Sequence, residues 1–194
     1  MSLRPIVAVS MAVGLAGCGI NSIPTAEETV KARWADVQND YQRRADLIPN
    51  LVSTVKAAGA QEKSILVEVT QARASANQVQ VAPDQLSDPA RLAAYQRAQN
   101  NVTMSLQRLQ EAYPELKSQG NYTTLMSQLE GTENRITVAR RDYNAAVQDY
   151  NTRIRTFPDA IGAKIFYGAK PKVPFEATSA NANVAPTVNF GNNS

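Results

Sequence analysis

Apolar residues recur at alternating spacings of three and four along most of the chain, and this periodicity constrains the fold more than any other feature. A stripe with this spacing follows one face of an α-helix and has to be buried against other helices. The sequence therefore predicts amphipathic helices that pack through heptad-like faces. The clearest stripe, which includes one glutamine, is Leu92, Tyr95, Gln99, Val102, Leu106, Leu109, Tyr113 and Leu116.

The first helical segment follows a short tether and contains a proline. Thr25 is a candidate N-cap, with Glu28 three residues later as its capping-box partner. The apolar stripe of this segment passes through Pro49 in phase. Pro49 therefore either kinks one long helix, or lies in the first turn of a second helix that Asp46 caps. The unbroken phase favours the kinked helix.

Proline and aspartate separate the next two helical segments. A second helix is expected over 61–80, and the residues 81–90 have the composition of a turn, with two prolines and two aspartates. Ser87 or Asp88 is the expected N-cap of the third helix, with Pro89 suited to its first turn.

The third helix should bend or break at Tyr113-Pro114, because proline cannot donate the hydrogen bond that continues a helix. Gly120-Asn121 then marks a turn. The fourth helix is expected to run from there to about Phe157, with Pro158 ending it.

Four amphipathic segments joined mostly by short loops predict an all-α fold. The expected architecture is an antiparallel, up-and-down four-helix bundle over 27–157, with long and partly kinked helices. An extended coiled-coil rod is the alternative. The turn at 81–90 and the glycines at 59 and 120 favour the bundle.

The C-terminal part of the chain divides into two segments of different composition. Residues 158–176 contain three prolines together with Phe166, Tyr167 and Phe175. This segment is too apolar for a free tail and too interrupted for a helix, so it is expected to dock on the bundle. Residues 177–194 are rich in Asn, Ala, Thr and Ser, which predicts a disordered tail.

The N-terminus has the parts of an export signal. Arg4 supplies a positive charge, a short apolar run follows, and Leu15-Ala16-Gly17-Cys18 resembles the lipobox of bacterial lipoproteins. We therefore expect residues 1–17 to be a cleaved signal peptide, Cys18 to carry the lipid, and 18–26 to form a lipidated tether. By the same resemblance, Gly19 favours delivery to the outer membrane over the inner membrane of a Gram-negative cell.

Charge and composition argue against several classes of function. Removal of residues 1–17 would leave 19 basic and 17 acidic residues, a net charge of +2, which is too small for a nucleic-acid surface. The chain has no histidine, which excludes Ser-His-Asp triads and histidine-based zinc or di-iron sites. No cofactor or metal is expected. A carboxylate-only enzyme is the minority interpretation, and the prediction is that the protein is not an enzyme.

Several polar residues lie on or beside the apolar stripes. Glu133 is expected to face at least one arginine from another helix, because an unpaired buried charge is costly. The set forms either a buried network that fixes the register of the helices, which is favoured, or a binding groove for a ligand or partner segment. Its candidate members are Arg44, Asp46, Gln99, Glu133, Arg140, Asn144 and Asn151.

Three stretches resemble the LemA family. They are QRRADLIPNLVSTVKAAG (42–59), EAYPELKSQGNYTTLMSQLEGTENRITVARRDYNAAVQDYN (111–151) and the FP that follows at 157–158. The resemblance covers about 30–160 and implies a helical bundle held at a bacterial membrane, without implying a reaction. The recurring residues of the family fall here on Arg43, Arg44, Asp46, Pro49, Asn50, Glu133, Asn134, Arg140, Tyr143, Asn144, Tyr150 and Asn151.

The resemblance also implies a partner and exposes one difference. Members of the family often accompany TPM-domain membrane proteins, so a membrane or periplasmic protein partner is expected. Typical members carry an uncleaved transmembrane helix where this chain has a lipobox. The combined expectation is a lipid-anchored, periplasm-facing envelope protein that acts as a non-enzymatic scaffold or adaptor. A periplasmic module that binds a ligand or peptide at the polar stripe is the alternative.

Overall fold

The computed structural model describes residues 21–59 and 62–176. The expected signal peptide, the lipidation site Cys18 and the tail 177–194 lie outside the described residues. Four long helices dominate the described chain: α2 (Ser22–Ala57), α3 (Lys63–Gln78), α4 (Pro89–Ala112) and α5 (Gly120–Arg153). The short elements are η1 (Pro83–Gln85), η2 (Pro114–Ser118), α6 (Asp159–Gly162) and the π-helical turn η3 (Ala163–Tyr167).

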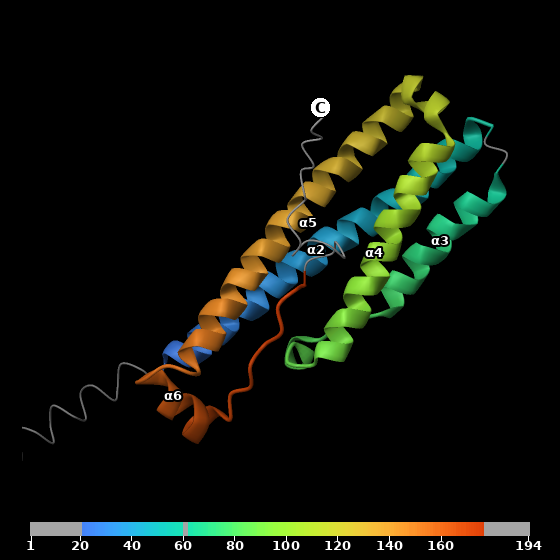
Figure 1. Cartoon of the computed structure of the whole chain (residues 1–194). Helices are drawn as coiled ribbons and strands as arrows, with labels where there is room; N and C mark the ends of the chain where they lie inside the picture. The colour runs from blue at the N-terminus through green and yellow to red at the C-terminus, as the bar shows by residue number, and fades with distance from the viewer. Residues whose placement is uncertain (1–20, 60–61, 177–194) are drawn as a thin grey trace, which may run out of the picture.

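The predicted all-α, up-and-down bundle is confirmed. Consecutive long helices run in opposite directions; α2 packs along α5, and α3 packs along α4 (Figure 1). At 1.5 Å per residue, the 36-residue α2 is about 54 Å long, whereas the 16-residue α3 is only about 24 Å long. The α3–α4 pair therefore covers only part of the α2–α5 pair. No helix in the described part of the chain has an apolar stretch long enough to cross a membrane.

The first helix begins earlier than the sequence suggests. Helix α2 starts at Ser22 with Asn21 as its N-cap, so the expectation of a tether to residue 26 and an N-cap at Thr25 is wrong. Thr25 instead lies in the first turn, where its hydroxyl donates a 2.8 Å hydrogen bond to the Asn21 carbonyl.

Pro49 lies inside one continuous helix, which confirms the first of the two alternatives. Proline has no N–H, so the carbonyl of the residue four positions earlier loses its helical donor. That residue is Ala45, and its carbonyl accepts a 2.7 Å hydrogen bond from Nε of Arg73 in α3. The defect in α2 is thus compensated by the neighbouring helix.

The turns at both ends of α4 follow from their residues. Asp88 is the N-cap, and its Oδ1 accepts hydrogen bonds from the backbone N–H groups of Ala90 and Arg91. At the other end, α4 breaks at Tyr113-Pro114 as expected, and α5 then begins at Gly120.

The end of α5 differs from the expectation. Helix α5 ends at Arg153, so the sequence prediction of a helix to Phe157 is too long. Phe157 is 82% exposed and does not continue the buried stripe. The nearby Pro158 accounts for the early end of α5. A proline drives the residue before it out of helical geometry, and the chain already turns in the residues that precede Pro158.

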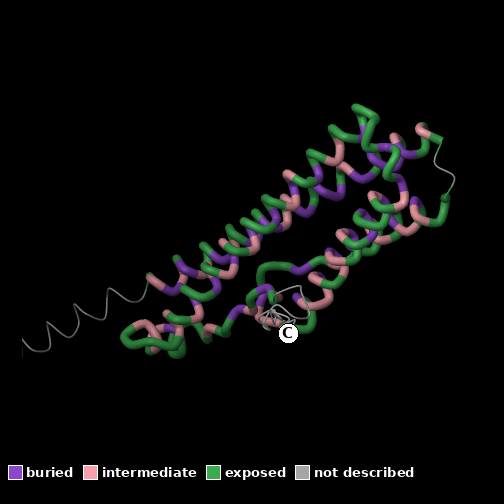
Figure 2. The backbone as a smooth tube through the Cα atoms, turned by 45° about the horizontal axis from the view of Figure 1, so that its top comes forward, coloured by how far each residue is buried: buried purple, intermediate pink, exposed green. Residues whose placement is uncertain are grey.

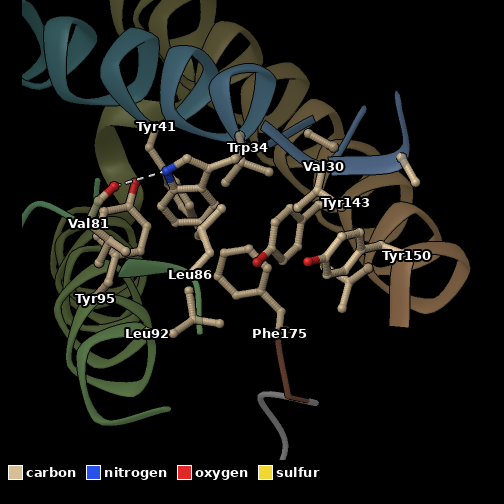
Figure 3. Packing of buried hydrophobic residues seen from close by; sticks show 14 of the residues in the cluster. Val30, Trp34, Tyr41, Val81, Leu86, Leu92, Tyr95, Tyr143, Tyr150 and Phe175 are labelled. Atoms are coloured by element: carbon tan, nitrogen blue, oxygen red, sulfur yellow. Dashed lines mark hydrogen bonds between the residues drawn. The ribbon is translucent and has the colours of Figure 1, made fainter. Parts of the chain in front are cut away.

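Buried side chains form two separate clusters along the bundle. Figure 2 shows buried and exposed positions alternating along the helices. Toward η2 lies an aliphatic core, built from all four helices, which includes Leu51, Val55, Leu66 and Leu109. Toward α6 lies an aromatic core around Trp34, Tyr95, Tyr143 and Phe175 (Figure 3). Two non-helical segments, the turn that carries Val81 and Leu86 and the segment that carries Phe175, complete the aromatic core, to which α3 contributes no buried residue.

Candidate functional site

The polar residues singled out in the sequence fall into two groups and one outlier. Arg44, Gln99 and Glu133 meet in a layer between the two cores. Arg140, Asn144 and Asn151 contact residues 169–176, which we call the strap. Asp46 joins neither group, because it is exposed on α2 and accepts a 2.7 Å hydrogen bond from Gln42.

Arg44 is the centre of the polar layer. Its guanidinium donates to Glu133 Oε1 at 2.5 Å and to the Thr103 hydroxyl at 2.8 Å. The other terminal nitrogen donates to both the side-chain and the backbone oxygen of Gln99, at 2.8 and 3.0 Å. The Arg44 side chain is only 2% exposed, whereas that of Glu133 is 36% exposed. The arginine expected opposite Glu133 is therefore a buried residue of α2.

The layer separates the two cores. Arg44 lies between Tyr41 of the aromatic core and Ile48 of the aliphatic core. A buried guanidinium requires both a counter-charge and several hydrogen-bond acceptors, and Glu133 of α5 and Gln99 of α4 supply them here. The layer thus links three helices between the two cores.

Burial and the nearby arginines act in opposite directions on the pKa of the tyrosine beside the layer. Burial raises the pKa of Tyr41, and the positive charges of Arg140 and Arg44 oppose part of that effect. The Arg44 guanidinium also lies over the Tyr41 ring, 5.0 Å from its centroid. Burial likewise raises the pKa of Tyr95, whose ring meets that of Tyr41 edge-on.

Two asparagines of α5 hold the backbone of the strap. The Asn144 side chain accepts from Phe175 N–H at 2.8 Å and donates to the Phe175 carbonyl at 3.1 Å. Asn151 makes the same pair of bonds to Lys172, both at 2.8 Å. Each amide therefore satisfies one residue of extended chain completely, as a neighbouring β-strand would.

The spacing of the asparagines matches the geometry of the strap. Seven residues of α-helix rise about 10.5 Å, and three residues of extended chain span about 10 Å. Asn144 and Asn151 are seven residues apart, and their partners Phe175 and Lys172 are three residues apart. The Tyr-Asn pairs at 143–144 and 150–151 thus form a two-point clamp for an extended segment.

The strap is also anchored by its side chains. Phe175 is 5% exposed and stacks on Trp34 at 5.8 Å between ring centroids, with an interplanar angle of 26° (Figure 3). The Tyr143 hydroxyl donates a 2.9 Å hydrogen bond to the Val173 carbonyl, and burial raises the pKa of Tyr143. The Lys172 ammonium pairs with Glu27 of α2 at 2.9 Å.

Helices α4 and α5 both contact the end of the strap. The Glu176 carbonyl accepts from Gln96 of α4 at 2.8 Å and from Arg140 of α5 at 3.0 Å. The Arg140 guanidinium also lies 4.8 Å from the centroid of the Phe175 ring. Arg140 is therefore a strap contact.

Sequence reasoning missed several residues that complete these contacts. Arg73 compensates Pro49, and the signal for it is the rule that a proline inside a helix frees a carbonyl that needs a donor. Gln96 and Thr103 carry no such signal, because they are ordinary polar residues beside the α4 stripe. The family positions Arg43, Asn50 and Asn134 are exposed.

A groove of about 410 Å³ lies between α4 and α5 beyond the polar layer. Leu106, Met126 and Leu129 line it with apolar surface, and Glu130 and Glu133 add negative charge. Arg140 does not line it, so the groove is separate from the strap contacts. Within the described residues, no group of three or more Cys, Asp and Glu side chains is arranged to hold a metal ion.

Fold and contacts together define a class of helical bundle whose incomplete end is closed by a C-terminal strap. The model of the LemA family matches residues 33–190 of the 194-residue chain, and the chain therefore belongs to the LemA family. The match extends past the region of resemblance noted in the sequence and includes the whole strap. Comparison with curated proteins gives no significant match.

Proposed function

We propose that the protein is a lipid-anchored component of the bacterial envelope that acts as a non-enzymatic scaffold or adaptor. The observation that carries this proposal is that the polar side chains of the bundle hold the chain's own segments. Asn144 and Asn151 bind the strap, and Arg44 is saturated by Gln99, Thr103 and Glu133. These groups stiffen a long bundle, which suits a rigid spacer fixed to a membrane at one end.

The sequence around Cys18 supports the anchor and its location. Lipidation at Cys18 would place the start of α2 close to a membrane, with the bundle facing the periplasm. Gly19 supports the outer membrane over the inner membrane as the site of insertion. A single acyl chain binds only marginally, so a stable anchor requires the several chains that a bacterial lipoprotein carries.

Membership of the LemA family supports a protein partner. Because family members often accompany TPM-domain membrane proteins, a protein of that class is the proposed partner. The anchored bundle would hold this partner at a fixed distance from the membrane surface. No nucleic acid enters the proposal, because the net charge of the chain is only +3.

The groove between α4 and α5 favours a second function. It is partly apolar and acidic at one side, and so would suit an extended or helical peptide with a basic residue. On this alternative the protein is a periplasmic peptide-binding module. The groove then replaces the polar stripe as the binding surface, because the stripe is occupied by the strap.

The anchor is tested by Cys18→Ala in cells fed a clickable palmitate analogue. The unchanged protein should be labelled and should fractionate with membranes, and protease should reach it only after the outer membrane is permeabilised. The variant should be unlabelled and should be unprocessed or mislocalised. A variant that remains in membranes at the mature mass would contradict the lipoprotein proposal.

The adaptor function is tested by chemical crosslinking in whole envelopes followed by mass spectrometry. A single dominant membrane or periplasmic partner, lost in the Cys18→Ala form, is the expected result. A photo-crosslinking residue at Gln107, which lines the groove, is compared with one at Asn101, exposed on the same helix away from it. A peptide captured at Gln107 alone, with no dominant partner, would favour the binding module instead.

A further inference from the structure

The end of the bundle that carries α6 and η3 is unusually apolar at its surface. Eight large hydrophobic side chains are exposed among the described residues, and five of them belong to the eleven-residue stretch 157–167. The other three, Val67, Met104 and Val138, belong to three different helices. Single exposed apolar residues are ordinary, but a cluster of them marks an interaction surface. We call residues 157–167 the tip.

The exposed apolar residues of the tip lie close together in the chain. Phe157 precedes α6, Ile161 lies in α6, and Ile165 and Phe166 lie in η3. Phe157, Ile161, Ile165 and Phe166 are 82%, 53%, 69% and 66% exposed. Figure 2 shows that this end of the chain is largely exposed. None of the four side chains belongs to either core.

The tip is fixed to the first residue of α2. The Ser22 hydroxyl donates a 2.7 Å hydrogen bond to Asp159 Oδ2, and α6 contacts α2 beside it (Figure 1). Four residue steps separate Ser22 from Cys18, and an extended chain of that length spans at most about 14 Å. A lipid on Cys18 would therefore hold the tip within a short distance of the membrane surface.

The charges around the tip suit an anionic surface. Arg155, Lys164 and Lys170 are exposed on or beside it. The neighbouring basic residues Arg153 and Lys172 already have carboxylate partners, Asp149 and Glu27. Asp159 is the acidic residue within 157–167, and it accepts the hydrogen bond from Ser22. Basic residues beside exposed aromatic and aliphatic side chains are the composition of surfaces that lie in the interface of anionic membranes.

We propose that the tip inserts Phe157, Ile161, Ile165 and Phe166 into the headgroup region of the membrane that holds the protein. The inference rests on the proposed lipid anchor at Cys18 and goes beyond it, because attachment through the lipid alone does not fix the tilt of the bundle. Two contacts, the lipid and the tip, fix the orientation of the bundle. The end that carries η2 then projects from the membrane by roughly the length of α2.

The test uses the lipidated full chain, because the diacylglyceryl group blocks the Cys18 sulfur and leaves an introduced cysteine as the single free thiol. A polarity-sensitive fluorophore is attached at Ile165→Cys, and at Asn121→Cys near the far end as the control. The proteins are placed in phosphatidylethanolamine–phosphatidylglycerol vesicles that contain nitroxide-labelled lipids. At position 165 the emission should shift to the blue and be quenched, whereas at position 121 it should match that of the probe in water.

A matched pair of variants separates insertion from mere proximity. With the fluorophore at Phe166→Cys, Ile165→Asp should abolish the shift, whereas Val67→Asp, on exposed α3 surface away from the tip, should leave it unchanged. A protein that stays on the vesicles with position 165 in water would overturn the tip proposal alone. A shift seen in native envelopes but absent from lipid vesicles would overturn it too and would assign the tip to a protein partner.

Failure of the anchor has a different signature. Cys18 would then react with the fluorophore, and the protein would wash off the vesicles. That result would overturn the lipid anchor and, with it, the inserted tip. Failure of the proposed function and failure of this inference alone are therefore distinguishable in the same samples.

Discussion

The aliphatic and aromatic cores bury apolar side chains by different means. In the aliphatic core all four long helices contribute. In the aromatic core three long helices, α2, α4 and α5, are joined by non-helical segments, whose backbone groups need outside partners. Trp34 Nε1 donates to the Val81 carbonyl at 3.0 Å, and Val173 N–H donates to the Leu86 carbonyl at 2.8 Å.

The difference explains where polar side chains are needed in the bundle. An extended segment can enter a helical core only if its N–H and C=O groups are paired, since each unpaired buried group costs about 1–3 kcal/mol. Asn144, Asn151 and Tyr143 supply these partners from α5. The polar residues beside the aromatic core are therefore needed for non-helical segments to complete the bundle.

The largest expected effect is that of Phe175→Ala. Removing a buried phenylalanine costs about 3–5 kcal/mol, and here the ring stacks on Trp34 and meets Tyr143 edge-on. Leu109→Ala in the aliphatic core should cost a similar amount, about 2–5 kcal/mol. Urea denaturation measures both losses.

Hydrogen exchange then separates the two cores. In Phe175→Ala, the backbone amide hydrogens of residues 172 and 175 should exchange well before the helices unfold, because the strap loses its anchor. Leu109→Ala should leave those amides as protected as the destabilised bundle allows. Equal loss of strap protection in both variants would mean that the two cores unfold as one unit.

Glu133→Gln tests the layer between the cores. The substitution keeps a hydrogen-bond acceptor near Arg44 but removes the counter-charge of a buried guanidinium, so we expect a loss of about 2–3 kcal/mol. Glu130→Gln, one turn away on the exposed surface of α5, is the control and should change the stability by less than about 0.5 kcal/mol. An unchanged melting midpoint in Glu133→Gln would mean that Gln99 and Thr103 suffice for Arg44.

Asn144→Ala tests the clamp without removing apolar surface. Both hydrogen bonds to Phe175 disappear while the Phe175 ring stays in place, and the expected loss is about 1–2 kcal/mol. The control is Asn134→Ala, an exposed asparagine of the same helix, which should change stability by less than about 0.5 kcal/mol. If exchange of the Phe175 amide is as slow as in the unchanged protein, the clamp does not hold the strap.

The two cores also differ in how far the sequence could predict them. The helices, their antiparallel order and the break at Tyr113-Pro114 follow from local signals, since periodicity and proline act within a few residues. The stripe that begins in α4 and continues into η2 is buried at every position, from Leu92 to Leu116. The ends of α2 and α5 were harder to predict. A threonine inside a first turn resembles an N-cap threonine, and a stripe that continues past the end of a helix resembles a longer helix.

Docking of the 158–176 segment was expected, and the strap docks, but 159–167 instead forms helical turns in which Phe166 is exposed. The register of the strap could not be predicted. Its pairing joins Asn144 to Phe175 and Asn151 to Lys172, over 31 and 21 residues of chain. No periodicity within 169–176 marks these partners, because an extended segment with two prolines has no repeat to match. The seven-residue spacing of the Tyr-Asn pairs is the one local indication of this pairing. It can be interpreted only once it is known that the two strap residues they bind are three residues apart.

Tyr143→Phe removes one hydrogen bond to the strap and should cost about 1 kcal/mol at neutral pH. Burial raises the pKa of Tyr143 above its ordinary value of 10.0, so the folded protein holds this proton more tightly than the unfolded chain. The resulting stability is present below pH 10 and is lost as the pH rises through the folded pKa. Melting midpoints measured above pH 10 should therefore fall less steeply in Tyr143→Phe than in the unchanged protein.

Tyr122→Phe is the smallest expected change and the sharpest contrast with Tyr143→Phe. Tyr122 lies in the aliphatic core, 1% exposed, and its hydroxyl has no hydrogen-bond partner among the described residues. Because the hydroxyl oxygen is buried without compensation, its removal should leave stability unchanged or raise it by up to about 1 kcal/mol. A loss as large as that of Tyr143→Phe would reveal a hidden polar partner in the aliphatic core. The contrast between Tyr122 and Tyr143 would then fail.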